Sequence, residues 1–210
     1  MAYNFPKLMF TPAMKALQEK HGSRRQYARF EDVASPDRFG PNEQRYIATR
    51  DSFYIASVAA NGWPYVQHRG GPVGFLKALD PATLAFADFR GNKQYVTTGN
   101  MSTEDRVALI LVDYPSQSRL KILGRAELIE PDTNAARFAE LIDRVRDPEY
   151  KAQVEAIMVI HVEAFDWNCQ QHIVPRYTTE QVQQVIAPLE ARIEELEAEN
   201  AALKALRASG

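Results

Sequence analysis

Arg90 and Lys93 flank a glycine in the stretch DFRGNKQYVTTGN, which runs from Asp88 to Asn100. Guanidinium and ammonium groups bind phosphate, and so do the free backbone amides at the start of a helix. Gly91 lets the backbone turn tightly and approach a ligand, and Asn92 is a favourable N-cap that would place Lys93 in the first helical turn. A cation there is disfavoured by the helix dipole unless an anion lies beside it. The stretch therefore predicts a local phosphate site.

A third cation, Arg69, follows in QHRGG, beside Gly70 and Gly71, whose lack of side chains permits close approach to a ligand. If the two strands that carry these stretches pair, Arg69, Arg90 and Lys93 converge on one anion. The alternative is that they are solvated surface cations, since the chain has 25 Lys and Arg residues.

A second dense group of polar and aromatic residues lies in FDWNCQQHIVPRY, from Phe165 to Tyr177. This density suits the wall of a site. A zinc site built from His161, Cys169 and His172 would use good ligands, but their spacing fits no standard zinc pattern, so no metal is predicted. Cys169 has no identifiable base partner that would make it a nucleophile. His161 and Glu163 share one face of a strand, where they suit a polar pair at the rim of the fold.

The length, the composition and the net charge limit the class of protein. A chain of 210 residues with 45% hydrophobic residues can form one domain with an appendage. The formal net charge of −2 provides no global field for nucleic acid or anionic lipid. A lone cysteine, and no signal-peptide or membrane-length apolar run, favour a cytoplasmic protein with no membrane partner.

Three segments are expected: helices and loops over 1–43, a strand-rich domain over 44–177, and a helix over 178–210. The strand-rich domain predicts six strands, at Phe53–Ala59, Pro64–Arg69, 83–89, 106–115, 118–130 and 156–165. Asn61-Gly62 predicts a hairpin between the first two, Gly124 a bulge, and 132–145 a helix. Short connections favour a mainly β, α+β fold with an antiparallel barrel and flanking helices.

The tail repeats apolar residues at alternating steps of four and three, over Val182, Ile186, Leu189, Ile193, Leu196, Asn200 and Leu203. This is a heptad pattern, and one polar residue in it, Asn200, favours a two-stranded pairing. Pro188 predicts that the continuous helix begins there, after a shorter helix capped by Thr178 and Gln181. The tail is either a coiled coil or a single amphipathic helix packed on the barrel, and residues 182–206 are a candidate surface for a protein partner.

Four stretches in their order, PYVQHRGG, LAFADFRGNKQYVTTGN, DRVALILVDYP and RLKILGRAELIE, resemble the pyridoxamine 5'-phosphate oxidase-like superfamily of FMN-binding split barrels. Within it, they are most similar to the branch described as predicted flavin-nucleotide-binding proteins. The resemblance spans about residues 44–177. It implies a six-stranded antiparallel split barrel and a homodimer that binds two FMN molecules between its subunits.

The resemblance also implies which residues contact FMN. Asn92 and Lys93 match the phosphate-binding pair, and Arg119 matches a position that reaches the flavin of the other subunit. The full set of expected cofactor contacts comprises Gln67, His68, Arg69, Gly70, Gly71, Ala87, Asp88, Arg90, Gly91, Asn92, Lys93, Gln94, Arg119, Trp167, Gln171, His172 and Arg176.

The implied activity is an FMN-dependent oxidoreductase that moves electrons from a small molecule or NAD(P)H to an acceptor such as oxygen. His68 and His172 are candidates for proton transfer by residue type alone. The sequence VPRYTTEQ leads into a long helix, where the vitamin B6 oxidases end in an Arg-containing substrate segment, so a vitamin B6 substrate is not expected. The alternatives are a non-catalytic flavin-binding or interaction module, and a split barrel that binds deazaflavin or haem, with His161 or His172 as haem ligand.

Overall fold

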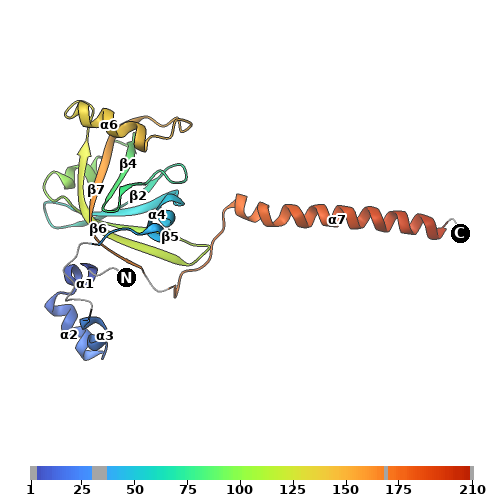
Figure 1. Ribbon diagram of the computed structural model, residues 1–210, viewed down its shortest axis with the longest axis horizontal. Coiled ribbons are helices and arrows are strands. Elements are labelled where there is room, and N and C mark those ends of the chain that lie inside the picture. The colour runs from blue at the N-terminus through green and yellow to red at the C-terminus, as the bar shows by residue number, and fades with distance from the viewer. Residues whose placement is uncertain (1–3, 30–36, 168–169, 209–210) are drawn as a thin grey trace. The chain divides into compact units, whose positions relative to one another are not determined.

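The computed structural model describes residues 4–29, 37–167 and 170–208 (Figure 1). The chain divides into two compact units, one of residues 1–113 and 118–171 and the other of residues 114–117 and 172–210. The first unit contains the sheet and the second contains the long C-terminal helix.

The first unit is built on one antiparallel sheet with the strand order β2-β1-β5-β6-β7-β4-β3. The strands are β1 (Ser52–Val58), β2 (Pro64–Gly70), β3 (Lys77–Asp80), β4 (Thr83–Phe89), β5 (Arg106–Asp113), β6 (Ser118–Ile129) and β7 (Val154–Trp167). The two ends of the sheet, β2 and β3, do not pair with each other, so the barrel stays open. The expected antiparallel α+β fold is confirmed.

The expected number of six strands is wrong, because the sheet has seven. The additional strand, β3, is the four-residue segment KALD. It is short and has no β-branched residues, and it is extended because it pairs with β4.

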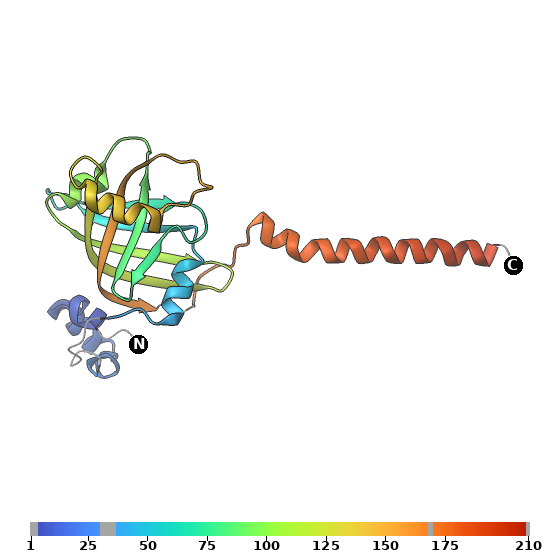
Figure 2. The same cartoon turned by 45° about the horizontal axis from the view of Figure 1, so that its top comes forward.

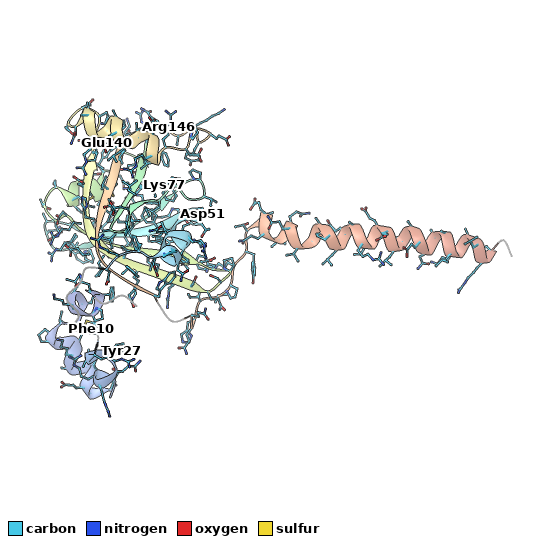
Figure 3. The ribbon with its side chains drawn as sticks, in the orientation of Figure 1. Phe10, Tyr27, Asp51, Lys77, Glu140 and Arg146 are labelled. Carbon is cyan, nitrogen blue, oxygen red and sulfur yellow. The ribbon has the colours of Figure 1, made fainter. Side chains whose placement is uncertain are left out.

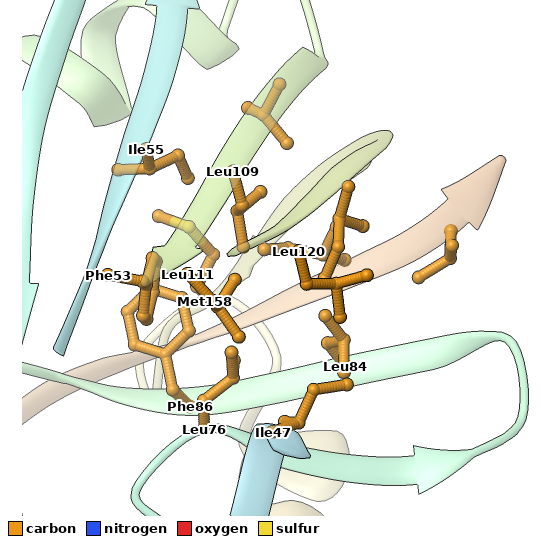
Figure 4. Close-up of a cluster of buried hydrophobic side chains, with 14 of the residues drawn as sticks. Ile47, Phe53, Ile55, Leu76, Leu84, Phe86, Leu109, Leu111, Leu120 and Met158 are labelled. Carbon is orange, nitrogen blue, oxygen red and sulfur yellow. The ribbon is translucent and has the colours of Figure 1, made fainter. Parts of the chain in front are cut away.

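One core fills the barrel and a second lies outside it. Alternate residues of the strands point inward and form the buried cluster of Phe53, Ile55, Leu84, Phe86, Leu109, Leu111, Leu120, Ile122, Met158 and Ile160 (Figure 4). The helix α6 (Ala135–Val145) covers the opposite face of β4 and β7, where Leu141 and Val145 pack against Ile157 and Val159 (Figure 2). Burial on both faces explains why β7 is apolar along most of its length.

Gly124 marks a bulge in β6, as expected. The register of β6 against β7 shifts between Leu123 and Gly124. A Cβ atom at Gly124 would lie 2.5 Å from the backbone oxygen of His161. Only glycine lets the two strands approach this closely.

Within the described residues, four helices precede the sheet: α1 (Asn4–Met9), α2 (Pro12–Lys20), α3 (Arg24–Ala28) and α4 (Pro41–Ala48). The expected start of a helix at Thr11-Pro12 is confirmed, since the Thr11 hydroxyl accepts a hydrogen bond from the Met14 amide at 3.4 Å. The Asn4 side chain donates to the Glu163 carbonyl at 2.7 Å and ties α1 to β7. The first and the last of these helices, α1 and α4, contact the sheet, while α2 and α3 pack on each other.

The second unit contains the single helix α7 (Thr179–Ala208). Thr178 and Gln181 cap it reciprocally, at 2.9 and 3.2 Å, as expected. The expectation that the continuous helix begins at Pro188 is wrong, because the helix runs through that residue. Proline removes one backbone donor, but the capped turns before it keep the other hydrogen bonds of the helix. Among the described helices, none combines the length and the apolar character needed to cross a bilayer.

Candidate functional site

The candidate site lies where the barrel is open, between β2, β4, the loop 90–95 and α5 (Val96–Met101). A cleft of about 210 Å³ lies there, lined by Tyr65, Gln67, Arg69, Asp88, Phe89, Gly91, Asn92, Lys93, Gln94, Tyr95, Val96, Thr97, Thr98 and Glu155. A smaller cleft of about 190 Å³ shares Gln67, Arg69, Asp88, Phe89 and Gly91 and adds His68, Gly70, Phe75, Phe86 and Ala87. The two clefts are therefore neighbours that share, among other residues, the pair Arg69 and Asp88.

Arg69 and Asp88 bridge the opening of the barrel. They lie on β2 and β4, which four strands separate in the sheet order, and their side chains are joined at 2.5 Å. Both side chains are largely buried, at 16% and 15% exposure. Arg69 Nε is buried and has no hydrogen-bond partner within the described residues. The Nε proton is therefore unpaired in the enclosed part of the side chain, while the Arg69 side chain still lines the cleft.

Asp88 has an unusual environment for a carboxylate. Burial raises its pKa, the Arg69 guanidinium opposes this, and the nearby Glu155 carboxylate adds to it, so the pKa lies above its ordinary value. The Asp88 carboxylate holds the Arg69 guanidinium in place. Because its pKa is raised, Asp88 becomes protonated at a higher pH than an exposed aspartate does.

Gln67 is oriented by α5. The Thr97 hydroxyl, which is buried, donates to Gln67 Oε1 at 2.7 Å. The helix itself is fixed to β1 by a buried hydrogen bond in which the Asn100 amide donates to the Ser57 hydroxyl at 2.9 Å. With its oxygen engaged, the Gln67 side chain presents its NH₂ group to the cleft as a donor.

Lys93 lies in a loop and not in a helix. The first helical residue is Val96, so the expectations that Asn92 is an N-cap and that Lys93 lies in the first turn are wrong. The Asn92 side chain instead accepts from the Gln94 amide at 3.1 Å, as asparagine does in turns. This local hydrogen bond competes with the helix and delays its start.

The loop holds two non-glycine residues in the left-handed region, Lys93 at φ 60° and Tyr95 at φ 52°. Such conformations cost on the order of 1–3 kcal/mol each and cluster at ligand sites. The Lys93 ammonium forms no hydrogen bond or ion pair with any residue that the structure describes. A strained loop therefore presents an unpaired cation to the same cleft as Arg69.

Arg90 is directed elsewhere. Its guanidinium donates to Gln153 Oε1 at 3.0 Å and lies 3.5 Å from Glu155 Oε1, both near the start of β7. It lines neither cleft. The structure brings Arg69 and Lys93 together and does not bring Arg90 to them.

Several residues of the cleft were not expected from the sequence, notably Tyr65, Thr97, Thr98 and Glu155. The alternation of β2 offers a signal for Tyr65, because it shares a face with Gln67 and Arg69. The other three come from α5 and β7, and only the folded chain brings them to β2. By the same alternation His68 lies on the opposite face, where its ring packs edge-on against Tyr54 at 5.4 Å.

The remaining expected residues are spread over the molecule. Gly70 and Ala87 line the smaller cleft. At Gly71, a Cβ atom would lie 2.7 Å from the Phe75 ring, which gives this glycine a packing role. Arg119 lies on β6, and Trp167 ends β7 with its Nε1 donating to Glu43 at 2.8 Å. These two residues and the exposed Gln171 line neither cleft.

His172 and Arg176 belong to the second unit. His172 has a left-handed backbone with φ 67°, and the Arg176 guanidinium lies 4.9 Å from the ring centre of Tyr114, in the same unit. Neither residue belongs to the unit that contains the two clefts.

The rim histidine, His161, has a local partner. Its Nε2 lies 3.0 Å from Glu127, and Glu163 pairs with Arg125 at 2.7 Å, so each of the two residues is satisfied by a neighbour and not by the other. Cys169 lies outside the described residues. In the described part of the chain, no group of three or more His, Cys, Asp or Glu side chains is placed to hold a metal ion.

The N-terminal helices form an apolar cavity of about 760 Å³ with the ends of β6 and β7. Phe10 and Tyr27 meet edge-on across it at 5.5 Å (Figure 3). Lys121, which is paired with Asp166 at 2.8 Å, lies over the Phe5 ring. This cavity shares no lining residue with the two clefts.

Comparison with known families shows to which protein family the chain belongs. Residues 40–168, more than half of the sequence, match the family model described as pyridoxamine 5'-phosphate oxidase. The chain belongs to the pyridoxamine 5'-phosphate oxidase-like family. The matched residues include the whole sheet and both walls of the cleft, so the site described above lies within the family domain.

Similar folds occur among solved structures. A candidate pyridoxamine 5'-phosphate oxidase from Lactobacillus delbrueckii is 22% identical, with a TM-score of 0.45 over 61% of this chain and 93% of that one. HupZ from Group A Streptococcus is 16% identical, with a TM-score of 0.47 over 66% and 100%. An FMN-binding protein from Syntrophomonas wolfei is 16% identical, with a TM-score of 0.43 over 72% and 97%. No curated protein matches the sequence.

Proposed function

We propose that the chain binds FMN at the Arg69–Lys93 cleft and is an oxidoreductase that passes electrons from a small molecule or NAD(P)H to an acceptor such as oxygen. One observation carries the proposal. In a domain of this family, a strained loop holds an unpaired Lys93 ammonium in the same cleft as the Arg69 guanidinium. Both groups suit a phosphate monoester.

The donors present fit the parts of FMN. Lys93 and Arg69 would bind the phosphate, and the oriented NH₂ group of Gln67 would donate to a carbonyl or hydroxyl of the cofactor. When bound, FMN supplies hydride and single-electron transfer, chemistry that side chains lack. Asp88 holds the Arg69 guanidinium at the opening of the barrel. His68 contributes to the smaller cleft, but its ring packs against Tyr54 on the face of β2 opposite Gln67 and Arg69, so no proton-transfer residue is assigned.

Cleft size supports a site completed by a second copy of the chain. The clefts measure about 210 and 190 Å³, below the range of roughly 300–1,000 Å³ for cofactor sites. Beside them, β1, β2 and their connecting turn expose Tyr54, Val58, Trp63 and Val66, which are 41–73% accessible. An exposed apolar patch of this kind marks an interface. We infer a homodimer whose subunits each supply one wall of the site.

Two titrations test the proposal. FMN added to the purified protein is expected to lose fluorescence on binding with micromolar affinity or better, and failure to bind at these levels would remove the proposal. Steady oxidation of NADH or NADPH well above the rate with free FMN is expected of an oxidoreductase. FMN binding without such turnover, with either nucleotide, would instead support a non-catalytic flavin-binding module.

A further inference from the structure

The helix α7 carries a continuous apolar stripe that its own unit leaves exposed. Every described residue of the helix is exposed, and none is buried. The stripe residues Val182, Ile186, Leu189, Ile193, Leu196 and Leu203 are 38–61% accessible. An apolar stripe at this spacing is typical of the seam of a coiled coil, and the residue types in the seam indicate the number and direction of the paired helices.

The seam has the composition of a parallel two-stranded coil. In heptad positions, Ile186, Ile193 and Asn200 occupy a, while Val182, Leu189, Leu196 and Leu203 occupy d. β-Branched residues at a combined with leucine at d favour two parallel strands over three or four. Each of the two described heptads with apolar a and d positions follows this rule.

Asn200 distinguishes the two directions of pairing. In a parallel, in-register pair, the two copies of Asn200 face each other and can hydrogen-bond. In the antiparallel pair that aligns the whole seam, Ile186 faces Leu203 and Asn200 faces Leu189. An amide opposite leucine is buried without a partner, which costs roughly 1–3 kcal/mol. The seam therefore favours the parallel pair.

The charges that flank the seam agree with this direction. In parallel coils, a g residue of one helix lies next to the e residue five positions further along the other. Here Arg192 would meet Glu197 of the second copy, and Glu199 would meet Lys204 of the second copy. Both contacts join opposite charges. Within its own helix, Arg192 pairs with Glu195, on the outer face, and leaves Glu197 available.

We propose that α7 pairs in parallel and in register with α7 of a second copy of this chain. A second copy of the stripe is the partner that fits it, because the two copies would match through the Asn200 pair and through two ion pairs on each side. This interface is independent of the FMN cleft and of the proposed pairing through β1 and β2.

Disulfide trapping in the full-length protein tests the direction and register. With the single native cysteine removed by Cys169→Ser, Leu196→Cys places a thiol at the seam, and Ala198→Cys places one on the opposite side of the same helix. Under mild oxidation, Leu196→Cys is expected to form a covalent dimer at least 10-fold faster than Ala198→Cys. Equal rates, or no dimer with Leu196→Cys, would overturn the proposal.

Charge reversal supplies a second test that does not alter the apolar seam. Glu199→Lys and Lys204→Glu should each slow trapping at Leu196→Cys, because each places like charges together across the pair. The double reversal should restore the rate. Residues five apart do not face each other within one helix, so the rescue can arise only between helices. If the losses in trapping rate simply add in the double variant, the parallel, in-register pair is contradicted. The stripe would then bind an antiparallel copy of the chain or another protein.

Discussion

At the scale of single residues, the site depends on an unbalanced cation. Lys93 has no partner among the described residues, and it is held in a left-handed backbone conformation. The left-handed backbone costs the free protein stability, and a phosphate bound by the exposed Lys93 ammonium would compensate for this cost. A ligand would therefore account for a strained lysine in this loop.

Lys93→Glu should weaken FMN binding by roughly 10- to 100-fold, because a charge-assisted hydrogen bond contributes about 1.5–3 kcal/mol. Fluorescence titration measures the loss. The matched control is Lys20→Glu, the same change at an exposed position of α2 that lines neither cleft. If both variants bind FMN like the wild type, the phosphate is not held at Lys93.

Asp88 should give a pH signature of stability. Its pKa is raised in the folded protein by burial, so its contribution is full below the unfolded pKa of about 3.9 and is lost as the pH rises through the folded value. The free energy of unfolding of the wild type, relative to that of Asp88→Asn, should therefore fall as the pH rises from about 4 and then level off. Urea unfolding of both proteins at several pH values measures this difference in free energy. If the wild type instead becomes more stable relative to Asp88→Asn as the pH rises, the raised pKa of Asp88 is contradicted.

The sequence allowed much of the cleft to be anticipated, since Gln67, Arg69, Asn92 and Lys93 all line it. The orientation of Arg90 could not be anticipated, because it depends on Gln153 and Glu155, more than sixty residues away. The turn at Asn92 could not be predicted either, because asparagine favours both helix caps and isolated turns.

At the scale of elements, the geometry of the opening is set by strand pairing. Apolar, β-prone runs predicted five of the seven strands, because each of these five has residues in a core, and the Asn61-Gly62 turn predicted β2, which places no residue in either core. Neither signal predicted β3, which is short and extended through pairing alone. The start of α7 was likewise misjudged, because a capped segment can continue through an internal proline.

Gly124→Ala should destabilise the barrel by about 1–3 kcal/mol, the range for overpacking a closed site. The added Cβ would meet the His161 backbone oxygen at 2.5 Å, and backbone atoms cannot easily move aside. Gly99→Ala in α5 is the control, because nothing lies within 4 Å of its Cβ position. Thermal unfolding of both variants measures the difference, and equal melting temperatures would mean that the two strands separate at low cost.

At the scale of the whole molecule, the chain offers two candidate surfaces for a second copy, the apolar patch on β1 and β2 and the seam of α7. The first lies beside the clefts and would complete the cofactor site. The second would hold two chains together through a separate unit. Pairing would explain why both surfaces expose large apolar side chains, which are aromatic residues and valine on β1 and β2 and mainly leucine and isoleucine on α7.

Val66→Glu tests the first surface. Val66 is 62% exposed, so the fold should tolerate the change, but a charge at the interface should weaken the dimer and reduce FMN affinity. Val73→Glu, at a loop position that is 70% exposed, is the matched control. FMN titration measures the effect, since α7 would still hold the two chains together and leave the mass unchanged. A Val66→Glu protein with unchanged FMN affinity would show that this face is not the shared wall of the site.

The most direct measurement of the central claim is the visible absorption spectrum of the freshly purified protein, with identification of any cofactor released on denaturation. We expect the two absorption bands of an oxidised flavin, and we expect the released compound to be FMN. A colourless protein that also takes up no added FMN would contradict the account, and so would a chromophore that proves to be haem or deazaflavin.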